Sequence, residues 1–282
     1  LDADLYHARA TMPNLLVAAA HTRQVNRPLV FTIAHWFDCT LEHLPEAQRA
    51  QYAAAIAGAM AVTSLTREMQ REVERRYDRE VVLIPPGHPV PERSPRKADP
   101  PLVLWLGRLN AVWRRPQLFI EIARRLADVP AQCLLVGPGS SYPIGAAGNA
   151  GAALAEAART SGNLRYVPGI RPGWDADLIA RAAVVVNTSS HEGFPNTFQQ
   201  AWLAGVPVAS LAVDPDRVIE REGLGVCTHG DLDELAGCIA RWLRSPRELC
   251  SLGVRCRRYA LHHHDIRRTA QRFDRLYRRL LG

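Results

Sequence analysis

The segment that decides the fold is residues 183–210, AVVVNTSSHEGFPNTFQQAWLAGVPVAS. Residues 183–187 are a short, continuous apolar run of the kind that forms a fully buried strand. A glycine-containing loop follows, then a helical stretch at 197–204 and a second apolar run at 206–210. A buried strand, a helix and another buried strand in this order predict a parallel sheet with helices on both faces.

The same alternation continues toward the N-terminus. Strands are expected at residues 102–106, 132–136 and 164–167, and helices at 116–127, 150–160 and 175–182. A short strand near Gly225 and two helices are expected to finish the chain. This pattern predicts a doubly wound α/β domain, whose ligands bind at the carboxyl ends of the strands.

The first hundred residues resemble only part of such a domain. They predict strands at 29–37, 59–64 and 81–84 with helices at 44–58 and 66–77, whereas a doubly wound domain usually has five or six strands. The proline-rich stretch 85–101 resists both helix and sheet. The expected organisation is a partial Rossmann-like domain at 1–90, a linker at 91–100 and a complete domain at 101–282. Because the chain opens on Leu1 without a signal-peptide pattern, the start of the first domain is expected to be missing.

Composition restricts the function classes. The 282 residues are 47% hydrophobic, too many for a disordered chain, and no apolar run reaches the ~18 residues of a membrane-spanning helix. The net charge of +7 comes from arginine, since Lys97 is the only lysine. Such a charge fits either a nucleic-acid or membrane surface or, as we favour, solvated helix faces. The six cysteines form no C-x-x-C pair, which argues against a zinc site and suits a reducing cytoplasm.

The last helix carries an apolar stripe at helical spacing, surrounded by arginines. Its members are Phe273, Leu276, Tyr277, Leu280 and Leu281. The stripe could lie on a membrane surface, but docking on the protein itself is the commoner explanation and is our prediction.

Two loops at the carboxyl ends of predicted strands carry candidate chemistry. In the first, the turn after Glu192 ends on a helix N-terminus, with Asn196 as the expected N-cap, and such a terminus attracts phosphate. A carboxylate beside an anion site suits sugar hydroxyls. In the second, GRLNAVWRRP at 107–116, Arg108 and Arg114 are placed to converge on a diphosphate, because the guanidinium fork pairs with phosphate oxygens.

These residues resemble glycosyltransferase family 4, which has the GT-B fold of two Rossmann-like domains. The segment EGFPN at 192–196 resembles the first half of the family's Glu-x7-Glu motif. Gly107-Arg108 and the RRP at 114–116 resemble its Gly-Arg and Lys-Arg-Pro elements, and LVGPG at 135–139 resembles its second-strand turn. The resemblance covers about residues 101–282 and, more weakly, the later part of the N-terminal domain, through the strand that ends on His35.

The resemblance implies a role for each matching residue. Arg108 and Arg114 would hold the donor diphosphate and stabilise the leaving nucleotide, Glu192 would bind hydroxyls of the donor sugar, and His35 would lie near the transferred sugar. A packed histidine at a strand end is the alternative for His35. Further donor contacts are expected from Gly107, Gly137, Gly169, Ile170, Gly193, Phe194, Asn196, Thr197 and Gln200.

The chain departs from the family pattern at Gln200, where a second glutamate usually binds the ribose. Glutamine keeps an acceptor and two donors, so we expect weakened recognition that Gln200→Glu would improve. The glycine-rich loop of the first domain, which normally completes the phosphate and acceptor site, is also expected to be absent.

The resemblance implies a retaining glycosyltransferase that moves a sugar from a nucleotide-diphosphate donor to a carbohydrate or lipid-linked acceptor, in polysaccharide or glycolipid synthesis. No cofactor and no metal are expected, because the Asp-x-Asp strings at 2–4 and 214–216 and the histidines at 262–264 lack a convincing context. The expected location is the cytoplasm, with the inner membrane face as an alternative. A non-catalytic nucleotide-sugar-binding module is the main rival. A Rossmann dehydrogenase is disfavoured because this chain lacks the G-x-G-x-x-G motif. A nucleic-acid binder is disfavoured because the basic residues of this chain are not interleaved with exposed aromatic residues.

Overall fold

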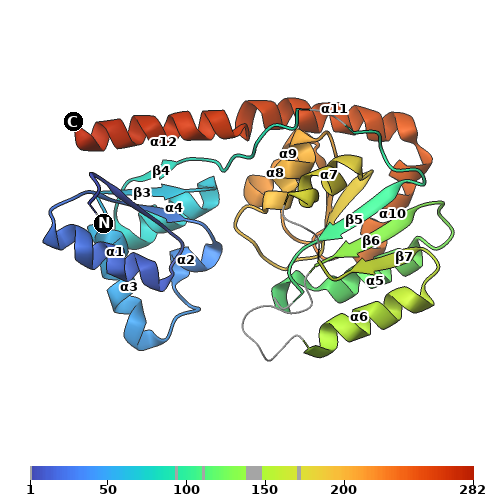
Figure 1. The fold of residues 1–282 in the computed structure, drawn as a ribbon, viewed down its shortest axis with the longest axis horizontal. Coiled ribbons are helices and arrows are strands. Elements are labelled where there is room, and N and C mark those ends of the chain that lie inside the picture. The colour runs from blue at the N-terminus through green and yellow to red at the C-terminus, as the bar shows by residue number, and fades with distance from the viewer. Residues whose placement is uncertain (1, 93–94, 110–111, 138–147, 170–172) are drawn as a thin grey trace. The chain divides into compact units, whose positions relative to one another are not determined.

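The computed structural model describes residues 2–92, 95–109, 112–137, 148–169 and 173–282. The chain forms two compact α/β units, and neither is one continuous stretch. The first unit contains Leu1–Gly87, Glu192–Phe194 and His263–Gly282, and the second contains His88–His191 and Pro195–His262. Each unit is built on its own parallel sheet (Figure 1). The domain boundaries expected from the sequence stay a prediction.

The second unit has a six-stranded sheet in the order β10-β9-β8-β5-β6-β7, with every neighbouring pair parallel. Its strands are β5 (Leu102–Leu106), β6 (Gln132–Val136), β7 (Leu164–Val167), β8 (Val184–Asn187), β9 (Val208–Ser210) and β10 (Gly225–Cys227). The chain builds outward from β5 to β7 and then returns to the other side of β5 to place β8. The strand order therefore reverses between β5 and β8, and a crevice opens at the carboxyl ends of the strands at such a point.

Helices cover both faces of this sheet because each presents an apolar stripe to it. They are α5 (Pro116–Arg125), α6 (Gly148–Thr160), α7 (Trp174–Arg181), α8 (Asn196–Leu203), α9 (Val218–Glu222), α10 (Leu232–Arg244) and α11 (Pro246–His263), with short 3₁₀ turns η1 (Val112–Arg114) and η2 (Pro215–Arg217). Phe119, Leu135 and Ile239 belong to one buried cluster that joins α5, β6 and α10. The sequence predicted two final helices, but three are present, counting α12 (Ile266–Leu281), because α10 ends at Arg244 with Ser245 as its C-cap and Pro246 starts a new helix.

The first unit has a four-stranded parallel sheet in the order β1-β2-β3-β4. Its elements are β1 (Tyr6–Arg9), α1 (Pro13–Gln24), β2 (Leu29–Ile33), α2 (Trp36–Thr40), α3 (Glu46–Gly58), β3 (Ala61–Ser64), α4 (Arg67–Tyr77) and β4 (Val81–Leu83). The sequence missed β1 because three of its four residues are not buried, so it carries no apolar run. The strand predicted at 29–37 stops at Ile33, because a helix cap at His35 starts α2.

Helix α12 docks on this sheet. Leu276 is buried in a cluster with Val30, Ala61 and Ile84, and Phe273, Tyr277 and Leu280 pack against the same cluster. Docking on the protein itself is thus confirmed for these four residues of the stripe, whereas Leu281 is exposed. Within the residues that the structure describes, no helix is both long enough and apolar enough to cross a bilayer.

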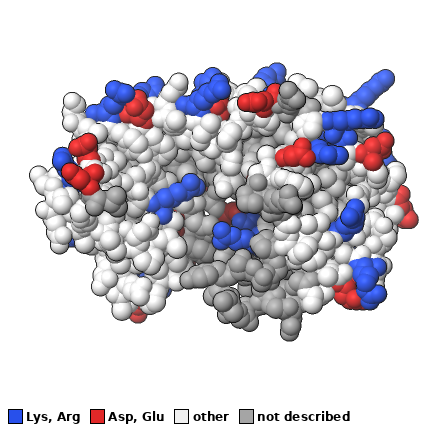
Figure 2. Space-filling model, in the orientation of Figure 1, with Lys and Arg blue, Asp and Glu red and all other residues white. Residues whose placement is uncertain are grey.

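The arginines are spread among acidic partners. On the face shown in Figure 2, basic and acidic side chains alternate over the surface and do not gather in one large patch. Many of the ion pairs join neighbouring turns of a helix, as in Arg75–Glu72, Arg124–Glu121, Arg159–Glu156 and Arg278–Asp274. This distribution is typical of solvated helix faces.

Candidate functional site

The loops that follow β5 and β8 are tied together by Thr188, which is fully buried. Its Oγ1 accepts a hydrogen bond from Trp105 Nε1 at 2.9 Å and lies 2.7 Å from the carbonyl oxygen of Arg114, to which it donates. Arg115 Nε in turn donates to the carbonyl oxygen of Thr188 at 2.8 Å. Arg114 is therefore held at the point where the strand order reverses.

A second hydrogen bond joins the same two loops. The backbone N–H of Ser190 donates to the carbonyl oxygen of Trp113 at 2.8 Å. The rings of Trp113 and His191 lie 5.9 Å apart at an angle of 30°. The hydrogen bonds and the ring contact thus hold the two loops, from η1 to His191, together at the carboxyl ends of β5 and β8.

Gly107 and Gly137 end β5 and β6 with their backbones in contact. A Cβ atom on Gly137 would lie 2.0 Å from the carbonyl oxygen of Gly107, so no other residue fits there. A Cβ atom on Gly107 would lie 3.3 Å from Nη1 of Arg114, which places the guanidinium directly over this glycine. Tyr166 on β7 donates from its hydroxyl to the carbonyl oxygen of Gly137 at 3.2 Å, and burial raises the pKa of this tyrosine. The two glycines therefore let their backbones approach each other closely beside the guanidinium of Arg114.

The remaining residues predicted along this edge lie as follows. Arg108 comes directly after Gly107 and is exposed. Gly169, two residues after the end of β7, is also exposed, and Ile170 lies outside the described residues. The structure thus brings Gly107, Gly137 and Arg114 together in direct contact.

The start of α8 differs from the prediction. Asn196 was expected as the N-cap, but Pro195 holds that position, and Asn196 is the first helical residue and is exposed. Proline fits there because its fixed φ and missing N–H are compatible with the residues that begin a helix. Asn196 and Thr197 thus contribute first-turn backbone N–H groups, the kind of donors that bind anions.

Gln200 is paired with a carboxylate that no sequence motif singles out. Its Nε2 donates to Oδ2 of Asp175 at 2.8 Å, which joins α8 to α7. Both side chains are half-buried. The glutamine is therefore hydrogen-bonded to an acid 25 positions earlier in the chain, and no local motif could have revealed the pair.

In the first unit, His35 lies two residues after the end of β2 and is the N-cap of α2. Its Nδ1 accepts from the backbone N–H of Phe37 at 3.3 Å, and the two rings stack 4.8 Å apart. Oδ2 of the buried Asp38 accepts from the backbone N–H groups of Ala34 and His35, at 2.8 and 2.9 Å. Its Oδ1 accepts from the N–H and hydroxyl of Thr11. Because Nδ1 is an acceptor, a neutral His35 carries its proton on Nε2.

Asp38 is thus a positioning residue that sequence reasoning missed. Asp38 closes a capping box with His35 in the structure, but a histidine followed three positions later by an aspartate is not the usual sequence pattern of that motif, so no local signal reveals it. The sequence instead placed both residues near an extended strand.

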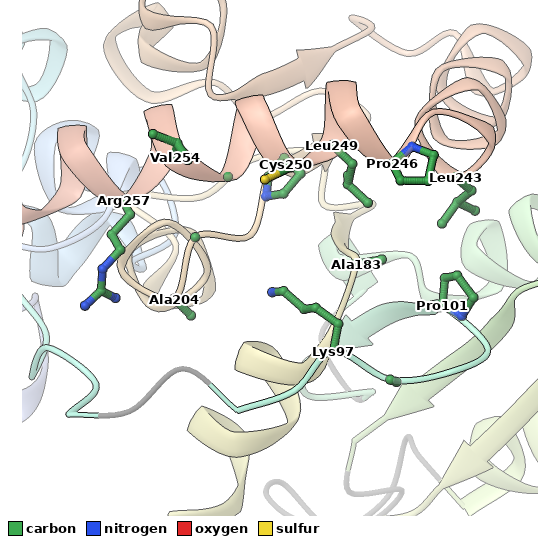
Figure 3. Close-up of a pocket in the computed structure, with 14 residues that line it drawn as sticks. Lys97, Pro101, Ala183, Ala204, Leu243, Pro246, Leu249, Cys250, Val254 and Arg257 are labelled. Carbon is green, nitrogen blue, oxygen red and sulfur yellow. The ribbon is translucent and has the colours of Figure 1, made fainter.

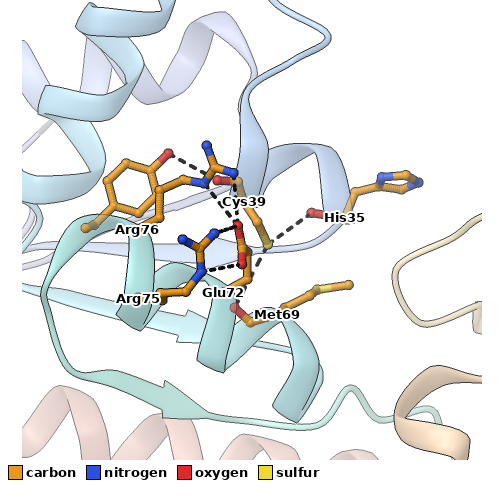
Figure 4. Close-up of polar contacts among 7 residues, drawn as sticks. His35, Cys39, Met69, Glu72, Arg75 and Arg76 are labelled. Carbon is orange, nitrogen blue, oxygen red and sulfur yellow. Dashed lines mark hydrogen bonds and ion pairs between the residues drawn. The ribbon is translucent and has the colours of Figure 1, made fainter.

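The cysteine nearest to this histidine is not a nucleophile. Burial is the main cause that raises the pKa of Cys39 to about 12. Its Sγ faces the carbonyl oxygens of His35 and Met69, at 3.9 and 4.0 Å (Figure 4). The acid beside it, Glu72, is held by Arg75 and Arg76, which lower the pKa of its carboxyl group. This cluster is structural.

The short segment Glu192–Phe194 belongs to the first unit. Gly193 is buried there, and a Cβ atom on it would lie 2.2 Å from the carbonyl oxygen of Ala34 and 3.1 Å from Cε of Met69. Phe194 packs on His264 with ring centroids 4.9 Å apart. Only glycine allows this approach, which brings residue 193 next to the residue that precedes His35.

Comparison with known families identifies the chain. The family model described as "Glycosyl transferases group 1" matches residues 100–245, more than half of the chain. The chain belongs to the glycosyl transferases group 1 family. A comparison with curated proteins finds no match.

Solved structures show that this group 1 chain has the GT-B fold. Sucrose-phosphate synthase from Thermosynechococcus elongatus is similar with a TM-score of 0.76 and 20% identity, over 98% of this chain and 73% of that one. HepE from Anabaena, in complex with UDP and glucose, has a TM-score of 0.79 and 18% identity, over 97% and 77%. A UDP-forming trehalose-phosphate synthase from Burkholderia xenovorans has a TM-score of 0.76 and 13% identity, over 99% and 74%. The α/β GT-B prediction is confirmed.

A resident metal has no evident ligand set in the part of the chain described. Among those residues, no group of three or more His, Cys, Asp or Glu side chains is placed to hold an ion. Asp214 accepts from the backbone N–H groups of Ile219 and Glu220, and Asp265 caps α12 by accepting from the N–H of Arg267. In this group 1 chain, these two acids accept hydrogen bonds from backbone N–H groups of a loop and of helix ends. Metal independence stays a prediction.

Proposed function

We propose that the chain is a retaining glycosyltransferase that takes its sugar from a nucleotide-diphosphate donor. The observation that carries this proposal is the position of Arg114 at the reversal of strand order, where Thr188 holds its backbone carbonyl oxygen and its guanidinium lies next to Gly107. A cation beside a glycine backbone suits a diphosphate, which needs charge neutralisation and close approach. The UDP and glucose bound to the similar HepE structure support a nucleotide sugar as the ligand.

Each neighbouring residue then has a role in transfer. Arg108 joins Arg114 on the diphosphate and stabilises the negative charge that grows as the nucleotide departs. The carbon–oxygen bond to the diphosphate breaks, and a bond to the acceptor oxygen forms on the same face of the sugar. The first-turn N–H groups of Asn196 and Thr197 add donors for the anion. Because the arginines neutralise the leaving group, the reaction needs no metal.

The sugar end of the donor is assigned to two side chains. Glu192 binds hydroxyls of the transferred sugar, and His35, whose Nε2 carries the proton when the ring is neutral, donates to the same sugar. Asp38 fixes the backbone on which His35 is mounted. Gln200 and Asp175 together supply acceptors for the ribose, in place of the single glutamate of the family pattern.

The acceptor is a hydroxyl of a carbohydrate or of a lipid-linked sugar, in polysaccharide or glycolipid synthesis. The proposed location of the reaction is the cytoplasm, with a peripheral position at the inner membrane face as the alternative.

The test removes both arginines. Arg108→Ala with Arg114→Ala should abolish binding of UDP-, GDP- and ADP-sugars in calorimetry, and transfer by the enzyme in the cell. Arg124→Ala with Arg159→Ala is the matched control, because it removes the same charge from exposed helical ion pairs. Near-normal transfer by the Arg108/Arg114 variant would refute the assignment. Donor binding without any transfer by the unaltered chain would instead favour a binding module.

A further inference from the structure

The second unit has a cavity of about 460 Å³ at the edge of the sheet opposite to the proposed donor site. Pro101, Ala183 and Pro207 line it, and they directly precede or adjoin the first residues of β5, β8 and β9. The donor site lies at the carboxyl ends of the same strands. The cavity is therefore a separate site, and its volume falls within the range of small-molecule pockets.

One wall of the cavity is a single face of α11 (Figure 3). Its residues recur at helical spacing: Pro246, Leu249, Cys250, Gly253, Val254 and Arg257. At Gly253 the helix touches the turn before β9, because a Cβ atom there would lie 2.5 Å from the carbonyl oxygen of Gly205. This backbone contact fixes the helix against the sheet. With Leu243 from α10, the walls are mostly apolar.

The opposite wall carries the only lysine of the chain. Lys97 points its ammonium into the cavity (Figure 3), where two of its N–H groups donate to the carbonyl oxygens of Ala180 and Ala182, at 2.9 and 3.0 Å. The backbone N–H of Ala98 donates to the carbonyl oxygen of Arg181 at 3.0 Å, which pins the base of the side chain. An ammonium has three N–H donors. The described residues accept from two of them, so the third is available to a ligand.

Charge is the unusual feature of this cavity. Lys97 is exposed as a whole residue, while desolvation lowers the pKa of its ammonium to about 8, so the group is still mostly protonated at neutral pH. Neither Asp nor Glu is among the residues that line the described cavity, and its other charged residue is Arg257. An anion with an apolar part would both pair with this ammonium and cover the apolar walls of the cavity.

We propose that this cavity binds a small apolar carboxylate, a molecule with one acid group and a hydrocarbon tail or ring. The carboxylate accepts the third hydrogen bond of Lys97, and the apolar part packs against Leu243, Leu249 and Pro101. The site is independent of the donor site, since no residue is shared between them. It gives the second unit a way to respond to an apolar acid while nucleotide sugar is bound.

Cys250 provides a direct measurement. It lines the cavity and is exposed, whereas Cys39, Cys133, Cys227 and Cys256 are buried and Cys238 is intermediate. A thiol-alkylating reagent should therefore react at Cys250 first, and peptide mass spectrometry gives its rate. Decanoate should slow alkylation about tenfold at roughly ten times its dissociation constant, because only the empty cavity exposes the thiol. Decanol, which has the same chain without the charge, should protect far less.

Variants separate the charge from the fold. Lys97→Met should lose the protection by decanoate, Lys97→Arg should keep most of it, and Arg258→Met, an exposed charge loss elsewhere on α11, should keep all of it. Equal protection by decanol and decanoate, or undiminished protection in a folded Lys97→Met variant, would overturn the proposal. If Lys97→Met does not fold, absence of decanoate protection in the unaltered chain and in Lys97→Arg would also overturn it. Protection by UDP in place of decanoate would equally count against a separate site.

Discussion

The pair of Gln200 and Asp175 gives the sharpest test of the site geometry. Gln200→Glu restores the residue type of the family pattern, and from sequence alone it should improve donor binding. In the structure, however, the amide nitrogen at this position donates to Asp175 at 2.8 Å. A glutamate would replace that donor with a second carboxylate, so the substitution should first destabilise the protein.

The size of the effect follows from the contact. A hydrogen bond to a charged group contributes about 1.5–3 kcal/mol. Two unit charges at the same separation would repel by about 1.5 kcal/mol in water and about 6 kcal/mol at an effective dielectric constant of 20. Because both side chains are half-buried and can move apart, we expect Gln200→Glu to lose roughly 1–3 kcal/mol of unfolding free energy at pH 7.

Urea unfolding followed by tryptophan fluorescence measures this loss. Adding Asp175→Asn should recover most of it, because an amide then faces the new carboxylate, and the double variant should bind donor more tightly than the parent chain. Gln117→Glu, an exposed change on α5, is the matched control and should stay within about 0.5 kcal/mol. The reasoning fails if Gln200→Glu alone is as stable as the parent, or if Asp175→Asn does not rescue it.

The remaining predictions concern other contacts. Gly193→Ala should destabilise the first unit by about 1–3 kcal/mol in thermal unfolding, because its Cβ would overlap the carbonyl oxygen of Ala34; Gly58→Ala, which meets nothing within 4 Å, should be neutral or stabilising. The stability of the parent relative to Lys97→Met should rise with pH from about 8 upward, because the folded pKa of Lys97 lies below its unfolded value and the unfolded chain then binds more protons; a flat difference between pH 7 and 10 would contradict this. Transfer should be unaffected by EDTA, and loss of activity that Mn²⁺ restores would show that the arginines do not suffice.

Local sequence patterns were enough to predict the strands and the site loops of the second unit. The predicted bounds of β5, β6 and β7 match the structure. The clearest case is β5, a continuous apolar run in a strand covered on both faces, which local composition reveals. The loops at 107–116 and 192–196 could likewise be found, since glycines and arginines after a strand are a local signal. In the first unit, β1 and α2 could not be found this way. An edge strand with polar residues and a five-residue helix have too few buried positions to leave a pattern.

By itself, the sequence determined the parallel α/β class, the edge of the sheet at which Gly107 and Arg114 lie, and the apolar stripe of the last helix. Only the tertiary structure decided which distant groups meet: Asp175 with Gln200, Thr188 with Arg114, and Lys97 with the carbonyl groups at the end of α7. The physical reason is the range of the forces involved. Hydrophobic periodicity is written in adjacent residues, whereas a hydrogen bond between residues 25 to 85 positions apart depends on where the whole chain has placed its helices.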